Sequence, residues 1–369
     1  MTTATESMVE THLEDLDVSR SERFAERMLS AFNESALVLM TSLGHRVGLF
    51  DAIAGAGWLA SHALARDAGL DERYVREWLA VMVTAGVVDY DPASQTYRLP
   101  AEHARFLTRD SVPNNLAATA QYIPVIATVE SDLVGCFRNG GGLSYERYER
   151  FHEVMAEDSA QTVVSALFDV IVPMVPGLHQ RLENGIRVAD VGCGSGRAML
   201  TLAAEYPNSR FWGFDLCAEP LERARAEAQA LGLKNLIFER RDLAEQTLAE
   251  PYDLVTAFDA VHDQRDPAGL LRSIRCALAR DGLFLMQDIA GSSELHRNLS
   301  HPLGPLLYAV STAHCTSVSL GQGGPGLGTM WGEELAERML RDAGFRSIDK
   351  CRLSHDIMNV YFIASSETN

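Results

Sequence analysis

Hydrophobic and polar positions alternate between strand-type and helix-type periods from about residue 185 to the end of the chain. Short apolar runs typical of buried strands cover residues 187–191, 210–215, 236–240, 252–258 and 283–288. Helical patterns separate them, most clearly at 220–231 and 267–279. A helix at 333–343, which Gly344 ends, leads to two more strand-like runs at 348–353 and 358–364. This order predicts parallel βαβ units and therefore an α/β domain with a doubly wound sheet.

The N-terminal half has a helical pattern instead. Residues 1–20 are polar and acidic and lack hydrophobic periodicity, so we expect them to form a flexible leader. Apolar side chains spaced by four residues predict a helix around 24–32. Asn33 and Ser35 then precede a second helix, 36–43, which is apolar nearly all round. A helix of this kind needs burial on more than one side, and a second subunit can provide one of them.

A third group of signals lies between residues 61 and 99. Ser61 is suited to cap a short helix that stops at Gly69, and Asp71 is suited to cap a second helix that stops at Gly86. Residues 87–99 contain two short strand-like runs around an Asp-Pro turn, which predicts a small hairpin. Two helices followed by such a hairpin predict a helix-turn-helix with a wing.

These patterns predict four segments along the chain. The leader of residues 1–20 precedes a winged-helix-like domain at 21–110, and a mostly helical linker and pocket cap follows at 111–184. The sheet domain covers 185–369 and contains a long insertion at 289–331, which is too long for a connector.

Composition and charge exclude several classes of function. The formal net charge of −18 repels phosphate backbones, so no nucleic-acid partner is expected. No apolar run is long enough to span a bilayer, so no membrane partner is expected either. The first 35 residues carry eight acidic and three basic side chains, the opposite of a targeting peptide. The six cysteines are scattered without any C-x-x-C pair, so a cytoplasmic protein with no metal is expected.

The strongest motif is the segment from Val188 to Gly196, where a strand runs into a glycine-rich turn at the start of a helix. Its glycines, Gly192, Gly194 and Gly196, have G-x-G-x-G spacing rather than the G-x-G-x-x-G of dinucleotide folds, which disfavours a dehydrogenase. Glycines let a backbone approach a ligand, and a helix N-terminus offers N–H groups to an anion. Because Asp190 precedes the turn, a ligand with both a carboxylate and an ammonium group fits this segment.

Acidic residues also end the next two strands. Asp215 stands where a carboxylate can accept both hydroxyls of a ribose. Asp242 stands where an acceptor for the amino group of a purine would be useful. Each position alone is also consistent with simple capping of a strand end, whereas the two together in this order favour a nucleoside-containing ligand.

This constellation resembles the class I S-adenosylmethionine-dependent methyltransferases over about residues 185 to 364. The resemblance implies a Rossmann-like seven-stranded sheet whose last two strands form an antiparallel pair. With the N-terminal half, the chain looks like the winged-helix-containing subgroup that modifies small molecules, of actinobacterial type. The resemblance implies S-adenosyl-L-methionine as cofactor, held by Asp190, Gly192, Gly194, Gly196, Asp215, Leu216, Asp242, Leu243 and Phe258.

The loop after the fourth strand contains His262 and Asp263. It resembles the His-Asp segment of small-molecule O-methyltransferases, in which the histidine is the general base. The resemblance implies His262 as base, oriented by Asp263 or Asp266. The loop departs from the family because Gln264 replaces the usual aromatic residue. A loop histidine that only makes a structural hydrogen bond remains the alternative.

Side chains for a substrate pocket are expected from the insertion and from the domain junction. The insertion, interpreted as a lid or pocket wall, contributes Tyr308, His314 and Trp331, and the junction contributes His152. His314 beside Cys315 is too short a pattern to predict a metal site.

The predicted reaction is methyl transfer to an oxygen or nitrogen of a small molecule, aromatic molecules included, by direct displacement. The competing interpretation is a regulator that binds S-adenosylmethionine without catalysis. Its recognition helix would open with Asp71-Glu-Arg-Tyr-Val-Arg-Glu, which is balanced in charge and has no basic stripe. We therefore expect the N-terminal helices to form a homodimer rather than to bind DNA.

Overall fold

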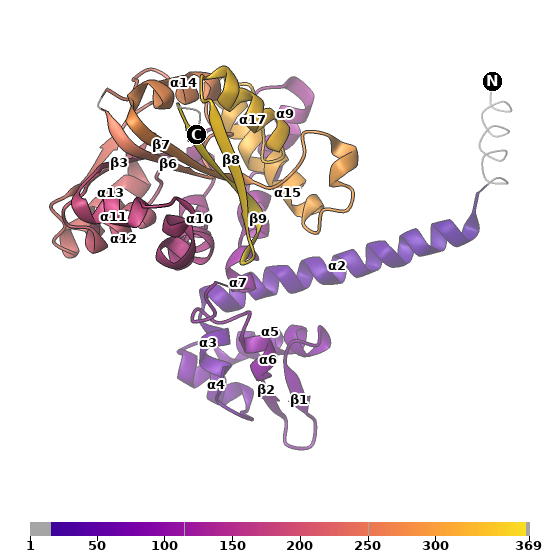
Figure 1. The fold of residues 1–369 in the computed structure, drawn as a ribbon. Coiled ribbons are helices and arrows are strands. Elements are labelled where there is room, and N and C mark those ends of the chain that lie inside the picture. Colours follow the sequence, from indigo (N-terminus) through magenta and orange to yellow (C-terminus); the bar gives the residue numbers. More distant parts are fainter. Residues whose placement is uncertain (1–15, 114, 250, 367–369) are drawn as a thin grey trace, which may run out of the picture. The chain divides into compact units, whose positions relative to one another are not determined.

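The computed structural model describes residues 16–113, 115–249 and 251–366, and the chain divides into two compact units between Arg109 and Asp110. The first unit is helical with a small hairpin, and the second contains the large sheet (Figure 1). Residues 111–184 fold as part of the second unit. Of the expected leader, residues 1–15 lie outside the described part of the chain.

The first unit opens with α2, a single helix from Val18 to Arg46. The expected break at Asn33 and Ser35 is wrong, because the Ser35 hydroxyl donates 2.7 Å to the carbonyl of Ala31 and so stays within the helix. The helix also begins two residues before the expected end of the leader at residue 20, because the Asp17 carboxylate caps it by accepting from the backbone N–H of Arg20 at 2.9 Å.

The winged helix-turn-helix follows as α3 Leu49–Ile53, α4 Ser61–Ala68, α5 Glu72–Thr84, β1 Asp89–Asp91, β2 Thr96–Arg98 and α6 Ala101–Ala104. Gly69 ends α4 and Asp71 caps α5 as expected. The expected cap at Ser61 is wrong, because its hydroxyl instead donates 2.6 Å to the carboxylate of Glu72. The hairpin strands pair Asp89 with Arg98 and are shorter than the apolar pattern indicated.

The second unit begins with short helices that lead to the sheet. They are α7 Leu116–Thr119, α8 Tyr122–Ala127, α9 Glu130–Asn139, η1 Tyr145–Arg147, α10 Phe151–Thr162, η2 Val164–Ala166, η3 Leu167–Ile171, η4 Val172–Met174 and α11 Leu178–Asn184. No single helix in the described ranges is long and apolar enough to cross a membrane. The helical segments 151–174 and 178–184, which meet at a bend of 104°, would be long and apolar enough together, by length and composition only.

The sheet has seven strands in the order β5-β4-β3-β6-β7-β9-β8. The strands are β3 Arg187–Val191, β4 Arg210–Asp215, β5 Leu236–Arg240, β6 Tyr252–Phe258, β7 Leu278–Ile289, β8 Ser347–Leu353 and β9 Asp356–Ser365. The first five of these are parallel, whereas β9 is antiparallel to both β7 and β8. The predicted doubly wound sheet with a terminal antiparallel pair is confirmed.

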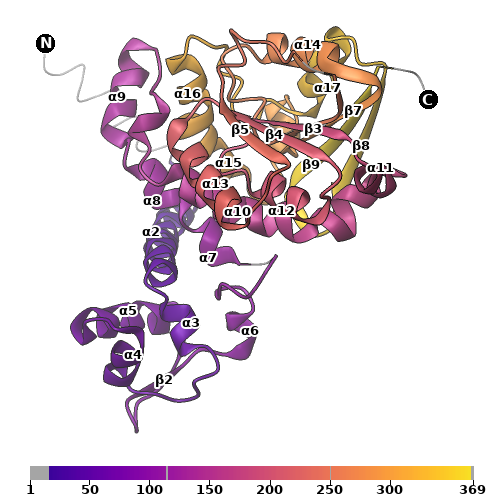
Figure 2. The same ribbon diagram turned by 90° about the vertical axis from the view of Figure 1, so that its left-hand side faces the viewer.

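Helices cover both faces of the sheet (Figures 1 and 2). One core is formed with α11, α12 Arg197–Glu205 and α13 Ala218–Ala230, and the other with α14 Pro267–Ala277 and α17 Glu333–Asp342. The strand order reverses between β3 and β6, and ligands of open α/β sheets bind in the crevice at such a point. The insertion between β7 and α17 forms η5 Leu295–Asn298, α15 Gly304–Val310, η6 Ser311–Cys315 and α16 Thr316–Gly321.

Candidate functional site

The glycine turn between β3 and α12 has a backbone that side chains would block. Gly192 and Gly196 adopt positive φ angles of 69° and 66°. A Cβ atom on Gly192 would lie 2.4 Å from the Cβ of Ala260, and one on Gly196 would lie 2.3 Å from the ring of Phe238. Both positions therefore require glycine for the conformation and for the space.

Asp215, at the end of β4, holds this turn in place. One of its carboxylate oxygens accepts from the backbone N–H of Gly194 at 2.8 Å, and the other accepts from that of Cys217 at 2.8 Å. Burial raises the pKa of this carboxyl above its usual value. Each oxygen retains lone-pair capacity for a further donor.

The turn and the strand ends form the first of two cavities, which has a volume of about 1140 Å³ counted out to its open mouth. All nine residues expected to hold the cofactor line it: Asp190, Gly192, Gly194, Gly196, Asp215, Leu216, Asp242, Leu243 and Phe258. Tyr145, Phe151, His152 and Met155 close it from the cap segment. The expected residues therefore converge on one cavity of the size that small ligands occupy.

Two acids of this cavity differ in their surroundings. Asp190 is buried, accepts a hydrogen bond of 2.7 Å from the Thr256 hydroxyl, and has a pKa that burial raises to about 7. Asp242 is more exposed and forms an ion pair of 3.1 Å with Arg265, which also lines the cavity. A ligand that donates to Asp242 would therefore share its carboxylate with the Arg265 guanidinium.

His262 is buried in the loop between β6 and α14, between two carboxylates. Its Nδ1 lies 2.8 Å from Oδ1 of Asp288, and its Nε2 lies 3.3 Å from Oδ1 of Asp263. The same Asp288 oxygen accepts from the Trp331 indole at 2.9 Å and from the backbone N–H of Ile289 at 2.8 Å. Because an ionised carboxylate only accepts, Nδ1 carries a proton and Nε2 is the basic nitrogen of the neutral ring.

The two carboxylates also decide the charge of this histidine. Burial lowers the pKa of His262, but the negative charges of Asp288 and Asp263 outweigh it, so the pKa lies well above the usual value. The imidazole therefore becomes a free base at a higher pH than an ordinary histidine does.

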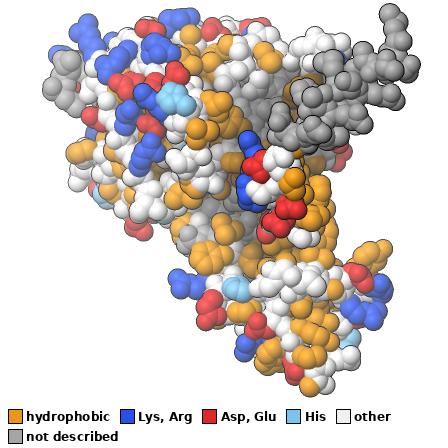
Figure 3. All heavy atoms as spheres, turned by 90° about the vertical axis from the view of Figure 1, so that its right-hand side faces the viewer, with side chains coloured by type: hydrophobic (Ala, Val, Ile, Leu, Met, Phe, Trp, Pro, Cys, Tyr) orange, Lys and Arg blue, Asp and Glu red, His pale blue; other side chains and the backbone are white. Residues whose placement is uncertain are grey.

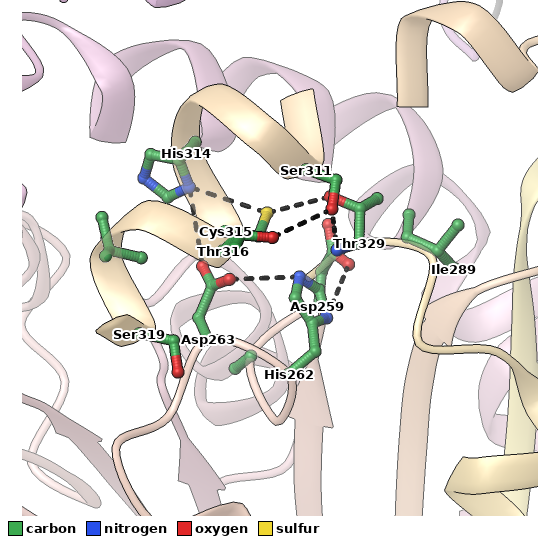
Figure 4. A network of polar contacts seen from close by, with 12 residues as sticks. Asp259, His262, Asp263, Ile289, Ser311, His314, Cys315, Thr316, Ser319 and Thr329 are labelled. Carbon is green, nitrogen blue, oxygen red and sulfur yellow. Dashed lines mark hydrogen bonds and ion pairs between the residues drawn. The ribbon is translucent and has the colours of Figure 1, made fainter. Parts of the chain in front are cut away.

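Asp263 connects His262 to the insertion (Figure 4). Its second oxygen lies 3.7 Å from Nδ1 of His314, which in turn stacks on Phe151 with ring centroids 3.5 Å apart. Burial raises the pKa of Asp263 and holds that of His314 well below its usual value. His314 therefore packs between Phe151 and Asp263, and its burial favours the neutral imidazole.

The second cavity adjoins the first. It measures about 650 Å³ counted out to its mouth, and its lining includes His262 and Cys315 together with apolar side chains of α15 and β9. Phe151, Met155, Asp259 and Asp263 line both cavities. Asp259 has a φ of 55°, a strained conformation for a residue other than glycine, and such strain persists where surrounding structure enforces it. The two cavities thus meet at the loop that carries His262.

Several substrate and positioning residues expected from the sequence lie elsewhere. Asp266 does not contact His262; it caps α14, where its carboxylate accepts from the N–H of Gly269 at 2.8 Å. Trp331, Tyr308 and His314 line neither cavity, because Trp331 holds Asp288, Tyr308 bonds Asn298 and His314 is fully buried. His152 lines the first cavity rather than the second.

The residues that were not anticipated include Asp158, Asp259 and Asn359, which line the second cavity, and Asp288, which bonds to His262 beside it. One sequence signal marks Asp288: it is an acidic residue at the end of a strand, and that strand neighbours the one that leads to His262. Asp158 and Asn359 come from α10 and β9, and no motif marked them.

The arrangement of side chains around His262 is compatible with binding of a metal ion. Two groups, His262 with Asp263 and Cys315, and His262 with Asp259 and Asp288, place ligand atoms within 4.8 Å of one another. In the second group, hydrogen bonds from three N–H groups already account for the position of the Asp288 carboxylate. The expectation that no metal is required stays a prediction.

Comparisons with known proteins agree with the fold. A family model described as an Rv2258c-like winged HTH domain matches residues 35–109, and one described as a methyltransferase domain matches residues 182–344. The two domain types expected from the sequence are confirmed.

Solved structures match nearly the whole chain. A putative O-methyltransferase from Nostoc punctiforme is 22% identical, with a TM-score of 0.70 over 93% of this chain and 98% of its own. Human N-acetylserotonin methyltransferase in complex with SAM is 18% identical, with a TM-score of 0.65 over 93% and 98%. At these identities the likeness establishes the fold.

Among curated relatives, a release factor glutamine methyltransferase of Xylella fastidiosa is 37% identical over 98 residues. That match covers 25% of this chain and 36% of the relative. The chain spans about a third to a half of the length of the curated relatives it matches.

Proposed function

We propose that this chain, a methyltransferase of the class I fold with an N-terminal winged-helix domain, transfers a methyl group from S-adenosylmethionine to an oxygen of a small organic molecule. The observation that carries the proposal is the meeting of the two cavities at Asp259 and Asp263, beside His262. One cavity holds the methyl donor and the other holds the acceptor, so the reacting atoms meet next to a buried base.

The first cavity suits the donor in three respects. The glycine turn leaves space where a Cβ would lie 2.4 Å from Ala260, and the helix N-terminus behind it attracts an anionic group. The buried Asp190 suits an ammonium, and Asp215 suits the ribose hydroxyls. When bound, S-adenosylmethionine supplies an electrophilic methyl group on a sulfonium.

The protein's own contribution is alignment, exclusion of water and one proton transfer. Phe151 and Met155 belong to both cavity walls and align the acceptor with the donor. Nε2 of His262 accepts the proton of the attacking hydroxyl, while Asp288 keeps Nδ1 protonated and stabilises the imidazolium that results. A hydroxyl needs such a base to become a strong nucleophile, which favours an oxygen acceptor.

Transfer of radioactive methyl from S-adenosylmethionine to a panel of hydroxylated aromatic molecules tests the function. We expect turnover with at least one of them and production of S-adenosylhomocysteine in equal amount. Binding of S-adenosylmethionine without turnover of any acceptor would instead favour the regulator interpretation. The pairing of basic residues on α5 with its own acids, Arg73 with Glu77 and Arg76 with Glu72, counts against that interpretation.

The Asp215→Ala variant is expected to bind S-adenosylmethionine about 1 to 3 kcal/mol more weakly, because two ligand hydroxyls lose a charged acceptor. The loss of the hydrogen bonds to Gly194 and Cys217 adds to the effect by loosening the turn. Titration calorimetry measures the affinity.

Asp215→Asn separates the two contributions, since one oxygen and its hydrogen bond remain. Asp349→Ala, at an exposed position of β8, is the matched control and should leave the affinity unchanged. An unchanged affinity in folded Asp215→Ala would remove this residue from the donor site.

A homodimer through α2 is part of the proposal. Every residue from Val18 to Ala36 is exposed, and Phe24, Leu29 and Phe32 remain 62%, 64% and 63% exposed. These positions share one face of the helix at a period of 3.6 residues. Figure 3 shows hydrophobic side chains exposed on the surface of the N-terminal unit. Because an uncovered helix is marginal in water, a second copy of α2 is the proposed cover.

Light scattering of the Leu29→Glu, Phe32→Glu double variant is expected to give the mass of a monomer, against a dimer for the wild type. Ser19→Glu with Ser30→Glu adds the same charge to the opposite face of α2 and should remain dimeric. A monomeric wild type would contradict this part of the proposal. The cytoplasmic location expected from the sequence stays a prediction.

A further inference from the structure

The second cavity is lined by hydrogen-bond acceptors that the methyl donor does not explain. Asp259 and Asp263 border both cavities and can face the sulfonium of the donor. Asp158 and Asn359 border the second cavity alone. They therefore face the acceptor molecule, and their chemistry bears on which molecule that is.

Asn359 presents a free acceptor. Its side-chain nitrogen donates to both oxygens of Asp356 at 2.9 Å, and the Tyr361 hydroxyl donates to one of them at 3.1 Å. An ionised carboxylate only accepts, so the amide is oriented with its nitrogen toward Asp356. The opposite atom, Oδ1, is buried without a partner among the described residues, although Asn359 is only 3% exposed. A buried acceptor without a donor is costly unless a ligand satisfies it.

Asp158 is a buried carboxyl without a cation. It is 8% exposed, it lies on α10 beside the Tyr122 hydroxyl, and no ion pair to it is found in the described part of the chain. The described residues that line the cavity include no lysine and no arginine. Burial raises the pKa of Asp158 to about 7 and that of Asp259 to about 8. A positive charge bound at Asp158 would restore the ionised form of that carboxyl.

We infer that the acceptor molecule carries a protonated amine, which binds to Asp158 and to Oδ1 of Asn359 in the second cavity. An ammonium group donates three hydrogen bonds and has no lone pair, so it serves as an anchor and the attacking atom is a separate hydroxyl. The apolar side chains Leu306, Leu307 and Val310 line the same cavity and suit the body of the molecule. This inference rests on the proposed function, because it assigns the second cavity to the acceptor.

Calorimetric titration of three matched phenols into the chain saturated with S-adenosylhomocysteine tests the inference. Tyramine carries an ammonium, 4-ethylphenol is uncharged, and 3-(4-hydroxyphenyl)propionate carries a carboxylate. We expect tyramine to bind about 10-fold or more tightly than 4-ethylphenol, as a charge-assisted hydrogen bond requires, and the carboxylate to bind most weakly. Equal affinities for tyramine and 4-ethylphenol, or no binding of tyramine at millimolar concentration, would overturn it.

The Asp158→Asn variant assigns the preference to one residue. It should bind tyramine and 4-ethylphenol with similar affinity, whereas Asp169→Asn, which removes an exposed carboxylate of η3, should keep the wild-type preference. A preference for tyramine that persists in folded Asp158→Asn would overturn the assignment. Affinity for S-adenosylhomocysteine itself is measured first. Its absence would defeat the proposed function, whereas its presence without an amine preference would defeat the present inference alone.

Discussion

Replacing His262 with alanine is expected to lower the methyl-transfer rate by about 10²- to 10⁴-fold, the usual cost of removing a general base. Affinity for S-adenosylmethionine should stay within a few-fold, because His262 lines the second cavity and not the first. Single-turnover rates and calorimetric affinities on the same preparations measure the two quantities. Their separation distinguishes a base from a residue that only supports the fold.

The variant should fold, because Asp288 keeps two of its three donors, Trp331 and the backbone of Ile289. Its melting temperature checks this, and His262→Gln, which fills more of the space, provides a second test. His296→Ala removes an exposed histidine of the insertion and is the matched control. Turnover within a few-fold of wild type in a folded His262 variant would mean that another group or water takes the proton.

The pH profile gives an independent readout. Because the pKa of His262 is raised by Asp288 and Asp263, the neutral imidazole accumulates only well above the ordinary histidine value of about 6.5. The wild-type rate should therefore rise with pH through neutrality and level off on the alkaline side. That rising limb should be lost in His262→Ala, with profiles recorded from about pH 6 to 10.

The sheet domain could be predicted closely from the sequence, because buried parallel strands leave an unambiguous pattern. The predicted run 252–258 is β6 to the residue, and the acids at 215 and 242 lie in the expected cavity. Glycine spacing located the turn for a physical reason: positive φ angles and steric contact with Ala260 and Phe238 admit no other residue there. Sequence pattern and local physics point to the same structure in this domain.

Contacts between distant parts of the chain could not be predicted in the same way. Asp266 lies four residues after His262 and was a plausible partner, yet the partner is Asp288 from the neighbouring strand. Trp331 was expected to meet a substrate, yet its indole supports Asp288. Both errors have one cause, since proximity in sequence does not indicate which side chains a parallel sheet places together.

In the N-terminal half, the local pattern rather than the distant contacts was misleading. Asn33 and Ser35 have low helix propensity, which predicted two helices, but α2 runs unbroken from Val18 to Arg46. Ser35 satisfies its hydroxyl on the carbonyl of Ala31, so its cost within the helix is small. Propensity alone is a weak guide when a side chain can bond to its own helix.

Asp288→Asn is expected to lower the plateau rate by about 10²-fold and to move the rising limb of the pH profile toward lower pH. An asparagine oxygen can still accept from Trp331, Ile289 and Nδ1 of His262, so the geometry is kept while the charge is lost. Without that charge the pKa of His262 falls, because burial is then opposed by Asp263 alone among the two carboxylates nearest to the ring. A base of lower pKa accepts the proton of the substrate hydroxyl less readily, so the rate falls even at a pH where the imidazole is fully neutral.

The measurement is kcat/KM against pH for wild type and variant, with affinity for S-adenosylmethionine and melting temperature as controls. A purely structural aspartate would lower the melting temperature and leave the midpoint of the profile where it was. Asp356→Asn, which alters a buried carboxylate bonded to Asn359 and Tyr361 rather than to His262, is the comparison. It should leave the midpoint unchanged. A midpoint that stays fixed in Asp288→Asn while the rate falls would show that Asp288 does not set the basicity of His262.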